Sequence, residues 1–125
     1  MAPLVSVVDD DISIRRSLDR LIRSFGLDVE LSASAEEFLT SAHPRKADCL
    51  VLDVRLPGMS GIELHRHLMA DGCEVPVIFV TAHASDDRAR ADAASDYTVA
   101  YLTKPFGEEE FLDAVDAALK WKPSA

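Results

Sequence analysis

The amino-acid sequence predicts an α/β fold, in which a parallel sheet lies between layers of helices. Two observations lead to this fold class. Short apolar runs alternate with amphipathic stretches five times along the 125 residues, and this alternation is typical of successive βα units. The apolar runs are nearly continuous, as expected for strands that are buried on both faces. The predicted architecture is therefore a three-layer sandwich of five parallel strands and five helices.

The first half of the chain predicts two strands and two helices. Leu4–Val8 is an apolar run and forms the first strand. An apolar stripe at helical spacing follows, and Gly26 ends that helix. The stripe consists of Ile14, Leu18, Leu21, Ile22 and Phe25. Leu27–Leu31 is the second strand, and Ser34 with Glu37 forms a capping box for a short helix.

The second half continues the alternation. In order, its predicted elements are a strand over Cys49–Leu52, a helix capped by Ser60 and Glu63 and ended by Gly72, a strand over Val75–Val80, a helix over Ala84–Ser95, a strand over Val99–Leu102 and a helix over Glu108–Trp121. The helix over Ala84–Ser95 is predicted from its alanine content. Glutamates in the first turn favour the start of the last helix.

The composition fits one domain with a core of its own. With 48% hydrophobic residues, a chain of this length can bury a core without disulfides or a structural metal. The net charge of -9 argues against nucleic-acid binding by this segment itself. Two cysteines without CxxC spacing indicate a reducing compartment. No apolar run approaches the length of a membrane span and no signal pattern precedes the first strand, so we expect a cytoplasmic protein without membrane contact.

Polar side chains follow four of the five predicted strands. They are Asp9, Asp10 and Asp11, then Asp53, Thr81 and Lys104. The carboxyl ends of parallel strands meet at one edge of a sheet, where the ligand site of such folds lies. Three or more carboxylates in one cleft raise one another's pKa unless a cation is present. Mg²⁺ prefers such oxygen ligands, so we expect a magnesium site at this edge.

Asp53 is the best nucleophile of this group, because it ends an apolar strand next to an open loop. A carboxylate that accepts a phosphoryl group forms an acyl phosphate, and the transfer needs mainly positioning and charge neutralisation. Lys104 would neutralise charge together with Mg²⁺, and the Thr81 hydroxyl would donate a hydrogen bond to a phosphoryl oxygen. On this interpretation the chain is not an enzyme but a phospho-acceptor, with self-catalysed phosphorylation and dephosphorylation.

Four motifs, VVDDD, LVLDVRLPGMSGIEL, VIFVTAH and YLTKPF, follow one another along the chain. In content and order they resemble the signatures of response-regulator receiver domains, and the resemblance covers nearly the whole chain. It implies that residues 1–125 form one receiver domain with a flavodoxin-like (CheY-like) fold and strand order 2-1-3-4-5. It also implies that the phosphoryl donor is a phosphohistidine on a sensor histidine kinase.

The same resemblance implies roles for individual residues. Asp10 and Asp53 would bind Mg²⁺ directly with the backbone carbonyl of Arg55, and Asp9 would act mostly through water. Lys104 would contact the phosphoryl group, next to a peptide to its proline neighbour that is cis in the family.

A subgroup is indicated by Arg55, two residues after Asp53, and by His83, two residues after Thr81. Together with DxRLPxMSGxEL and EEFL, this pairing resembles FixJ-type receivers. His83 would then tune the lifetime of the acyl phosphate with Arg55, and a plain surface histidine is an equal alternative. FixJ-type receivers precede a LuxR-type DNA-binding domain that activates transcription. Residues 120–125 would be either a truncated linker to such an output domain or a true terminus.

Receiver domains act as switches, and the resemblance implies how this one would respond. Phosphorylation adds roughly -1.5 to -2 charge at the acceptor. Thr81 would move toward the phosphoryl group and Tyr101 would fill the vacated space, although ordinary packing explains Tyr101 equally well. The face made by the fourth helix, fifth strand and fifth helix would change, and relatives of this subgroup form homodimers through that face.

Two departures from the family pattern lie near that face. The sequence reads Asp96-Tyr97-Thr98 where the family usually has a Gly-Ala pair, and the spacing from Thr81 to Lys104 is one residue longer than usual. Both fall in the fourth helix and its exit. The sequence therefore leaves open whether the signal leaves the domain by the usual route.

Two other functions remain possible from the sequence. Asp9-x-Asp11 with a later threonine and lysine resembles, in outline, a haloacid-dehalogenase-type (HAD-type) phosphatase with Asp9 as nucleophile. A receiver-fold interaction module that is never phosphorylated is the other alternative. Simpler roles are expected elsewhere, with Asp11 as a helix N-cap and with Arg15 and Arg16 solvated. His65 and His67 are two residues apart on a helix and share no face, which argues against a metal site there.

Overall fold

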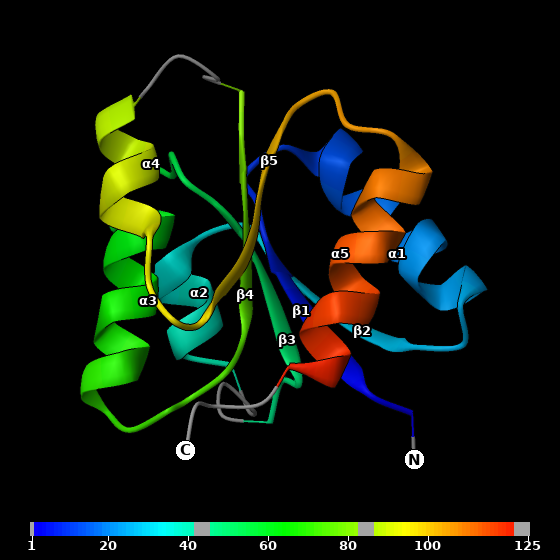
Figure 1. Ribbon diagram of the computed structural model, residues 1–125, viewed down its shortest axis with the longest axis horizontal. Helices are drawn as coiled ribbons and strands as arrows, with labels where there is room; N and C mark the ends of the chain where they lie inside the picture. Colours follow the sequence, from blue (N-terminus) through cyan, green and yellow to red (C-terminus); the bar gives the residue numbers. More distant parts are fainter. Residues whose placement is uncertain (1, 42–45, 83–86, 122–125) are drawn as a thin grey trace.

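A computed structural model describes residues 2–41, 46–82 and 87–121. The strands form one parallel sheet in the order β2-β1-β3-β4-β5, as predicted. They are β1 Leu4–Val8, β2 Asp28–Ser32, β3 Cys49–Asp53, β4 Val77–Thr81 and β5 Thr98–Thr103; the helices are α1 Ile12–Ser24, α2 Ala35–Leu39, α3 Gly61–Ala70, α4 Asp87–Ala93 and α5 Glu108–Lys120. Helices α1 and α5 cover one face of the sheet, and α2, α3 and α4 cover the other (Figure 1). The predicted three-layer sandwich is confirmed.

Several strand boundaries differ from the prediction. β2 is shifted by one residue, β3 ends one residue later, and β5 is one residue longer at each end. The largest difference is in β4, which begins at Val77 rather than Val75 and ends at Thr81. Pro76 explains the later start of β4, because a proline has no N–H to donate to the ladder of a central strand. The predicted residues 84–86 of the fourth helix lie outside the described part of the chain. Across the described residues, none of the helices is long and apolar enough to cross a membrane.

Side chains and a glycine set the helix ends where the sequence predicts them. The Asp11 carboxylate accepts a hydrogen bond from the Ser13 N–H at 2.8 Å, so Asp11 is the N-cap of α1. α3 begins with a complete capping box of Ser60 and Glu63, and a serine also caps α2. Gly26, after α1, has a φ of 77°, a conformation that side chains disfavour. These local signals fix where each helix starts and stops against the sheet.

The core consists of two apolar clusters, one on each face of the sheet. Alternate residues of β3 and of β4 enter opposite clusters; in β3, for example, Val51 enters one and Leu52 the other. The cluster under α1 and α5 includes Ile22 and Phe111, both fully buried. The cluster on the opposite face includes Phe79, also fully buried. The continuous apolar strands are therefore explained by burial on both sides.

β5 contains one residue more than the stretch of β4 that it faces. Val99 lies between the partners of Val77 and Ile78 and has no partner of its own in the ladder, which is the pattern of a β-bulge. Beyond this bulge the pairing is regular up to Thr81 and Thr103. The additional residue therefore leaves the carboxyl end of β5 in register with β4.

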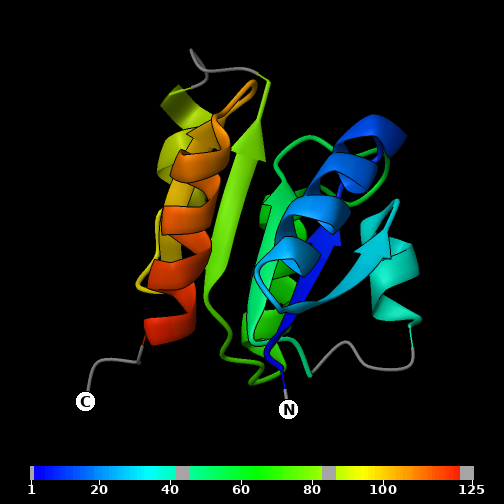
Figure 2. The same ribbon diagram turned by 90° about the vertical axis from the view of Figure 1, so that its right-hand side faces the viewer.

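The turn before β5 packs against the end of α5. The rings of Tyr97 and Trp121 lie 4.8 Å apart, and the Trp121 indole N–H donates a hydrogen bond to the Asp96 carbonyl at 3.1 Å. Figure 2 shows this end of α5 beside the start of β5. Asp96 and Tyr97, at the place where the sequence departs from the family pattern, thus pack against Trp121 at the end of α5.

A histidine lies in the core on the α3 side. His65 is 5% exposed, and its ring meets the Phe79 ring edge-on at 5.8 Å. Its Nε2 is buried and has no hydrogen-bond partner among the described residues. Burial lowers the pKa of His65. His67 is exposed on the opposite side of the helix, so the two histidines do not form a metal site.

This environment predicts that His65 makes the protein less stable in acid. The folded state holds the imidazole neutral, whereas the unfolded chain binds a proton below about pH 6.5. The stability that this group contributes is complete above that pH and is lost as the pH falls toward the lowered pKa of the folded state. The unfolding free energy, measured by urea unfolding, should therefore fall less between about pH 7.5 and pH 5.5 in His65→Phe than in the wild type. His67→Gln is the matched control, and an equal effect of both variants would contradict the assignment.

Candidate functional site

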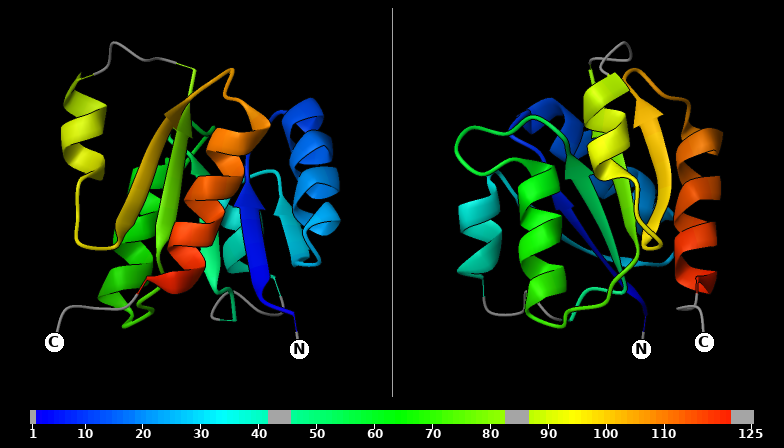
Figure 3. Two further views of the ribbon diagram at one scale, coloured as in Figure 1. Left: turned by 45° about the vertical axis from the view of Figure 1, so that its right-hand side comes forward. Right: turned by 60° about the vertical axis from the view of Figure 1, so that its left-hand side comes forward.

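The carboxyl ends of the strands lie along one edge of the sheet, the upper edge in Figure 3. β1 leads to Asp9, β3 ends at Asp53, β4 ends at Thr81 and β5 leads to Lys104. The Lys104 ammonium donates to a carboxylate oxygen of Asp9 at 2.7 Å and to one of Asp53 at 3.3 Å. Residues from distant parts of the sequence therefore meet at this edge.

Asp9 is fully buried, and hydrogen bonds hold both its carboxylate and its backbone carbonyl. One carboxylate oxygen accepts from the Asp11 N–H at 2.9 Å, and the other contacts Lys104. The backbone carbonyl of Asp9 accepts from the Arg15 guanidinium at 2.7 Å. The expectation that Arg15 is solvated is therefore wrong, because its side chain folds back onto the loop after β1. Arg16 is exposed, as expected.

Asp53 lies at the end of β3 with 9% of its side chain exposed. One oxygen accepts from the Arg55 N–H at 3.1 Å and the other from Lys104. Burial and the negative charge of Asp9 raise the pKa of Asp53 to about 6, although Lys104 and the Arg55 N–H act in the opposite direction. The charged form of Asp53 is therefore unfavourable in the fold, in spite of the lysine beside it.

Three carboxylates at this edge form an acidic pocket. Asp9, Asp10 and Asp53 each offer one oxygen, and these atoms lie within 4.8 Å of one another. Asp10 is exposed, while the other two are buried. An all-oxygen donor set suits a hard divalent cation, and a cation would relieve the charge that raises the pKa of Asp53. The pocket is compatible with a divalent metal on both grounds.

Lys104 is positioned by its backbone. Its N–H donates to the Thr81 carbonyl at 2.7 Å, and its peptide bond to Pro105 is cis. Burial acts to lower the pKa of Lys104, but hydrogen bonds and charges of Asp9 and Asp53 outweigh it and raise the pKa. The lysine therefore stays positively charged at neutral pH.

Thr81 and Tyr101 lie on the two strands next to this pocket. Thr81 is 1% exposed at the end of β4. The Tyr101 ring on β5 lies 6.4 Å from the Phe79 ring, and the Arg90 guanidinium of α4 lies 5.0 Å from the centre of the Tyr101 ring. The predicted tuning residue His83 lies outside the described residues.

Two residues that the sequence analysis did not single out position the loop after Asp53. A Cβ at Gly61 would collide with the Asp53 carbonyl oxygen. The Glu36 carboxylate accepts from the Met59 N–H at 3.0 Å, and a Cβ at Gly58 would lie 2.7 Å from that carboxylate oxygen. Both residues belong to motifs of the sequence, EEFL and MSG, but only the spatial contacts explain why those residue types occur there.

Known proteins resemble this chain throughout its length. A family model described as the response regulator receiver domain matches residues 5–116. Nodulation protein W of Bradyrhizobium diazoefficiens is 48% identical over 92% of this chain and 50% of its own length. Transcriptional regulatory protein FixJ of Azorhizobium caulinodans is 40% identical over 92% of this chain and 54% of its own length. The chain thus spans about half the length of these curated relatives.

Solved structures agree with this likeness. The crystal structure of FixJ-N is 32% identical, with a TM-score of 0.85, and the match covers 100% of this chain and 99% of that one. The strand order and the acidic pocket at the carboxyl edge correspond to the CheY-like fold that the motifs imply. The chain belongs to the receiver domains of response regulators, the family that works with sensor kinases in two-component signalling.

Proposed function

We propose that Asp53 accepts a phosphoryl group from a phosphohistidine on a sensor histidine kinase, with the help of Mg²⁺. The observation that carries this proposal is the contact of one ammonium group, on Lys104, with both Asp9 and Asp53. This contact fixes a positive charge beside the acceptor oxygen. Further carboxylate oxygens lie within 4.8 Å, which supports a metal ion at the same place.

In the transfer, a carboxylate oxygen of Asp53 attacks the phosphorus while the P–N bond to the donor imidazole breaks. The products are an acyl phosphate on this chain and a free histidine on the kinase. Asp10 and Asp53 would hold Mg²⁺ directly with the Arg55 carbonyl, and Asp9 would act through water. The ion would supply positive charge to the phosphoryl oxygens. Lys104 would turn from the free carboxylate to a phosphoryl oxygen.

Asp9 is the less suitable acceptor of the two buried carboxylates. Its side chain is 1% exposed, and Lys104 approaches it more closely than it approaches Asp53. This difference favours a phospho-acceptor over a HAD-type phosphatase that uses Asp9. The chain would therefore act on no separate substrate, and hydrolysis of its own acyl phosphate would reset it.

Phosphorylation would change the face made by α4, β5 and α5. The added charge of roughly -1.5 to -2 would draw the Thr81 hydroxyl toward the phosphoryl group. Tyr101, which lies between Phe79 and Arg90, would respond to that movement. A two-state element of this kind can control homodimerisation through the α4-β5-α5 face. Arg55 and His83 would tune how long the acyl phosphate lasts.

The full-length protein would pass this signal to DNA through an output domain. The relatives in the comparison are about twice as long as this chain, and one is named a transcriptional regulatory protein. We propose a LuxR-type output domain after a linker that begins near residues 120–125. The protein would act in the cytoplasm, where its kinase partner presents the phosphohistidine.

Asp53→Asn should abolish phosphorylation by acetyl phosphate in the presence of Mg²⁺, because an amide cannot form an acyl phosphate. Intact-mass spectrometry measures the added phosphoryl group, and Asp28→Asn on β2 serves as a control that should react like the wild type. Full labelling of Asp53→Asn would reject Asp53 as the acceptor. A wild type that never labels would instead favour the unphosphorylated interaction module.

The same substitution should stabilise the metal-free protein. The raised pKa of Asp53 means that its charge is unfavourable in the fold at neutral pH, by about 1–3 kcal/mol. Asp53→Asn should therefore raise the melting temperature by several degrees at pH 7. The gain should shrink as the pH falls through 6, where the wild-type carboxylate takes up a proton. Mg²⁺ should raise the melting temperature of the wild type more than that of the variant, and the opposite order would contradict a metal site at Asp53.

Gly61→Ala should impair phosphorylation, because its methyl group would push against the backbone of Asp53. We expect a loss of about 1–3 kcal/mol of unfolding free energy, as for other overpacked sites, and slower labelling by acetyl phosphate at a temperature where the variant is folded. Gly107→Ala is the matched control, since a Cβ there meets no atom within 4 Å. Equal labelling rates for the two variants would show that the contact with Asp53 does not position the acceptor.

A further inference from the structure

The loop between β3 and α3 contains Arg55, whose backbone carbonyl is the proposed metal ligand. At one end of the loop, the Val54 N–H extends the pairing of β3 by donating to the Val80 carbonyl at 2.9 Å. At the other end, the Gly61 N–H donates to the Val54 carbonyl at 3.2 Å, which closes the loop on itself. These bonds fix where the loop begins and ends. The path of the residues between them depends on other contacts.

Helix α2 supports the middle of this loop. Leu56 is 8% exposed and belongs to the same apolar cluster as Phe38 of α2. The Glu36 carboxylate of α2 accepts a hydrogen bond from the Met59 N–H at 3.0 Å, across 23 positions of the sequence. The helix and the loop are therefore joined by a shared apolar cluster and by a hydrogen bond from the loop backbone.

The contact between Glu36 and the loop has a specific chemistry. Glu36 is exposed, and the hydrogen bond from the Met59 N–H lowers the pKa of its carboxyl. The acceptor is therefore a charged oxygen at neutral pH, and charged acceptors make stronger hydrogen bonds than neutral ones. Gly58 has a φ of 75°, and a Cβ there would lie 2.7 Å from the Glu36 carboxylate. A glycine at this place lets the carboxylate reach the turn.

We infer that Glu36 is a positioning residue for the metal, which raises the affinity for Mg²⁺ through the path of the loop. Its carboxylate is not one of the three that form the acidic pocket, so it acts without binding the ion. A loop that is held at Met59 presents the Arg55 carbonyl in place, whereas a loop released there must be ordered when the ion binds. The inference rests on the proposed function, because it takes that carbonyl as a ligand.

Two variants of Glu36 test the inference. Glu36→Ala removes the acceptor, and Glu36→Gln keeps an oxygen that can accept while it removes the charge. Titration of the metal-free protein with Mg²⁺, followed by NMR, measures the dissociation constant. Glu36→Ala should raise this constant by about three- to tenfold, the scale of one lost hydrogen bond. Glu36→Gln should stay within about twofold of the wild type.

Labelling by acetyl phosphate at increasing Mg²⁺ separates positioning of the metal from a general loss of structure. In Glu36→Ala, the Mg²⁺ concentration for half-maximal rate should rise by the same factor as the dissociation constant. The rate at saturating Mg²⁺ should remain that of the wild type, because the ion then holds the loop in place. A rate lowered by the same factor at every Mg²⁺ concentration would contradict the inference.

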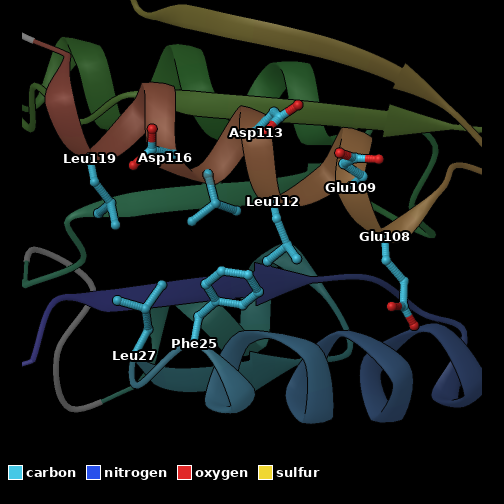
Figure 4. A pocket seen from close by; sticks show the side chains of 9 residues that line it. Phe25, Leu27, Glu108, Glu109, Leu112, Asp113, Asp116 and Leu119 are labelled. Carbon is cyan, nitrogen blue, oxygen red and sulfur yellow. The ribbon is translucent and has the colours of Figure 1, made fainter.

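Two controls match the loss of charge. Glu37→Ala changes the next residue, which also lies in the first turn of α2. Asp113→Ala removes a charge on the opposite face of the sheet, in the groove between α5 and the end of α1 (Figure 4). Both variants should bind Mg²⁺ like the wild type. Without metal, the Met59 amide proton should shift upfield in Glu36→Ala and keep its position in both controls.

The outcomes separate this inference from the proposed function on which it rests. If the wild type binds Mg²⁺ and Glu36→Ala binds it equally well, the inference is wrong and the metal site stands. Equal losses in Glu36→Ala and Glu36→Gln would assign the effect to charge instead of the hydrogen bond. An equal loss in Glu37→Ala would assign it to the stability of α2, and either result would overturn the inference. If the wild type itself binds no Mg²⁺, the proposed metal site fails, and the inference fails with it.

Discussion

The contact of Lys104 with two buried carboxylates is the interaction on which the site depends. Asp9 and Asp53 are both buried and lie close together, so a cation beside them offsets part of the cost of burying negative charge. Lys104 supplies one positive charge, and its place follows from the last hydrogen bond between β4 and β5. Burial and the negative charge of Asp9 outweigh this lysine, so the pKa of Asp53 remains raised. The unfavourable charge of Asp53 in this pocket also favours a divalent ion there.

This dependence explains where the chain can vary. The extra residue in β5 is taken up at Val99, at the end of the strand far from Lys104. The pairing of Thr81 with Thr103 is preserved, so the lysine still reaches its carboxylates. The adjoining turn is free to differ, and in this chain Tyr97 and Trp121 pack into a corner there. A change in this turn is thus compatible with an unaltered pocket.

Much of this arrangement was predictable from the sequence, because it follows from strand ends. Apolar runs and caps gave the order of elements, and a parallel sheet necessarily brings Asp9, Asp53 and Lys104 to one edge. Contacts made by long side chains across loops were not predictable. Arg15 was expected in solvent and instead contacts the Asp9 carbonyl, and Glu36 contacts the loop after β3. Neither contact leaves a periodic pattern in the sequence, because each joins a side chain to a backbone group whose position is set only by the folded loops. The position of the bulge was not predictable either, because it is set by how β4 and β5 pair.

The molecule therefore carries an acidic pocket at the carboxyl edge of a sheet that helices cover on both faces. The central claim concerns the pocket: its lysine and carboxylates select one aspartate as the phosphoryl acceptor. The most direct measurement is to phosphorylate the wild type, reduce the acyl phosphate with borohydride and find the modified residue by peptide mass spectrometry. The account predicts modification at position 53 alone. Modification at position 9, or at a residue outside the pocket, would contradict it.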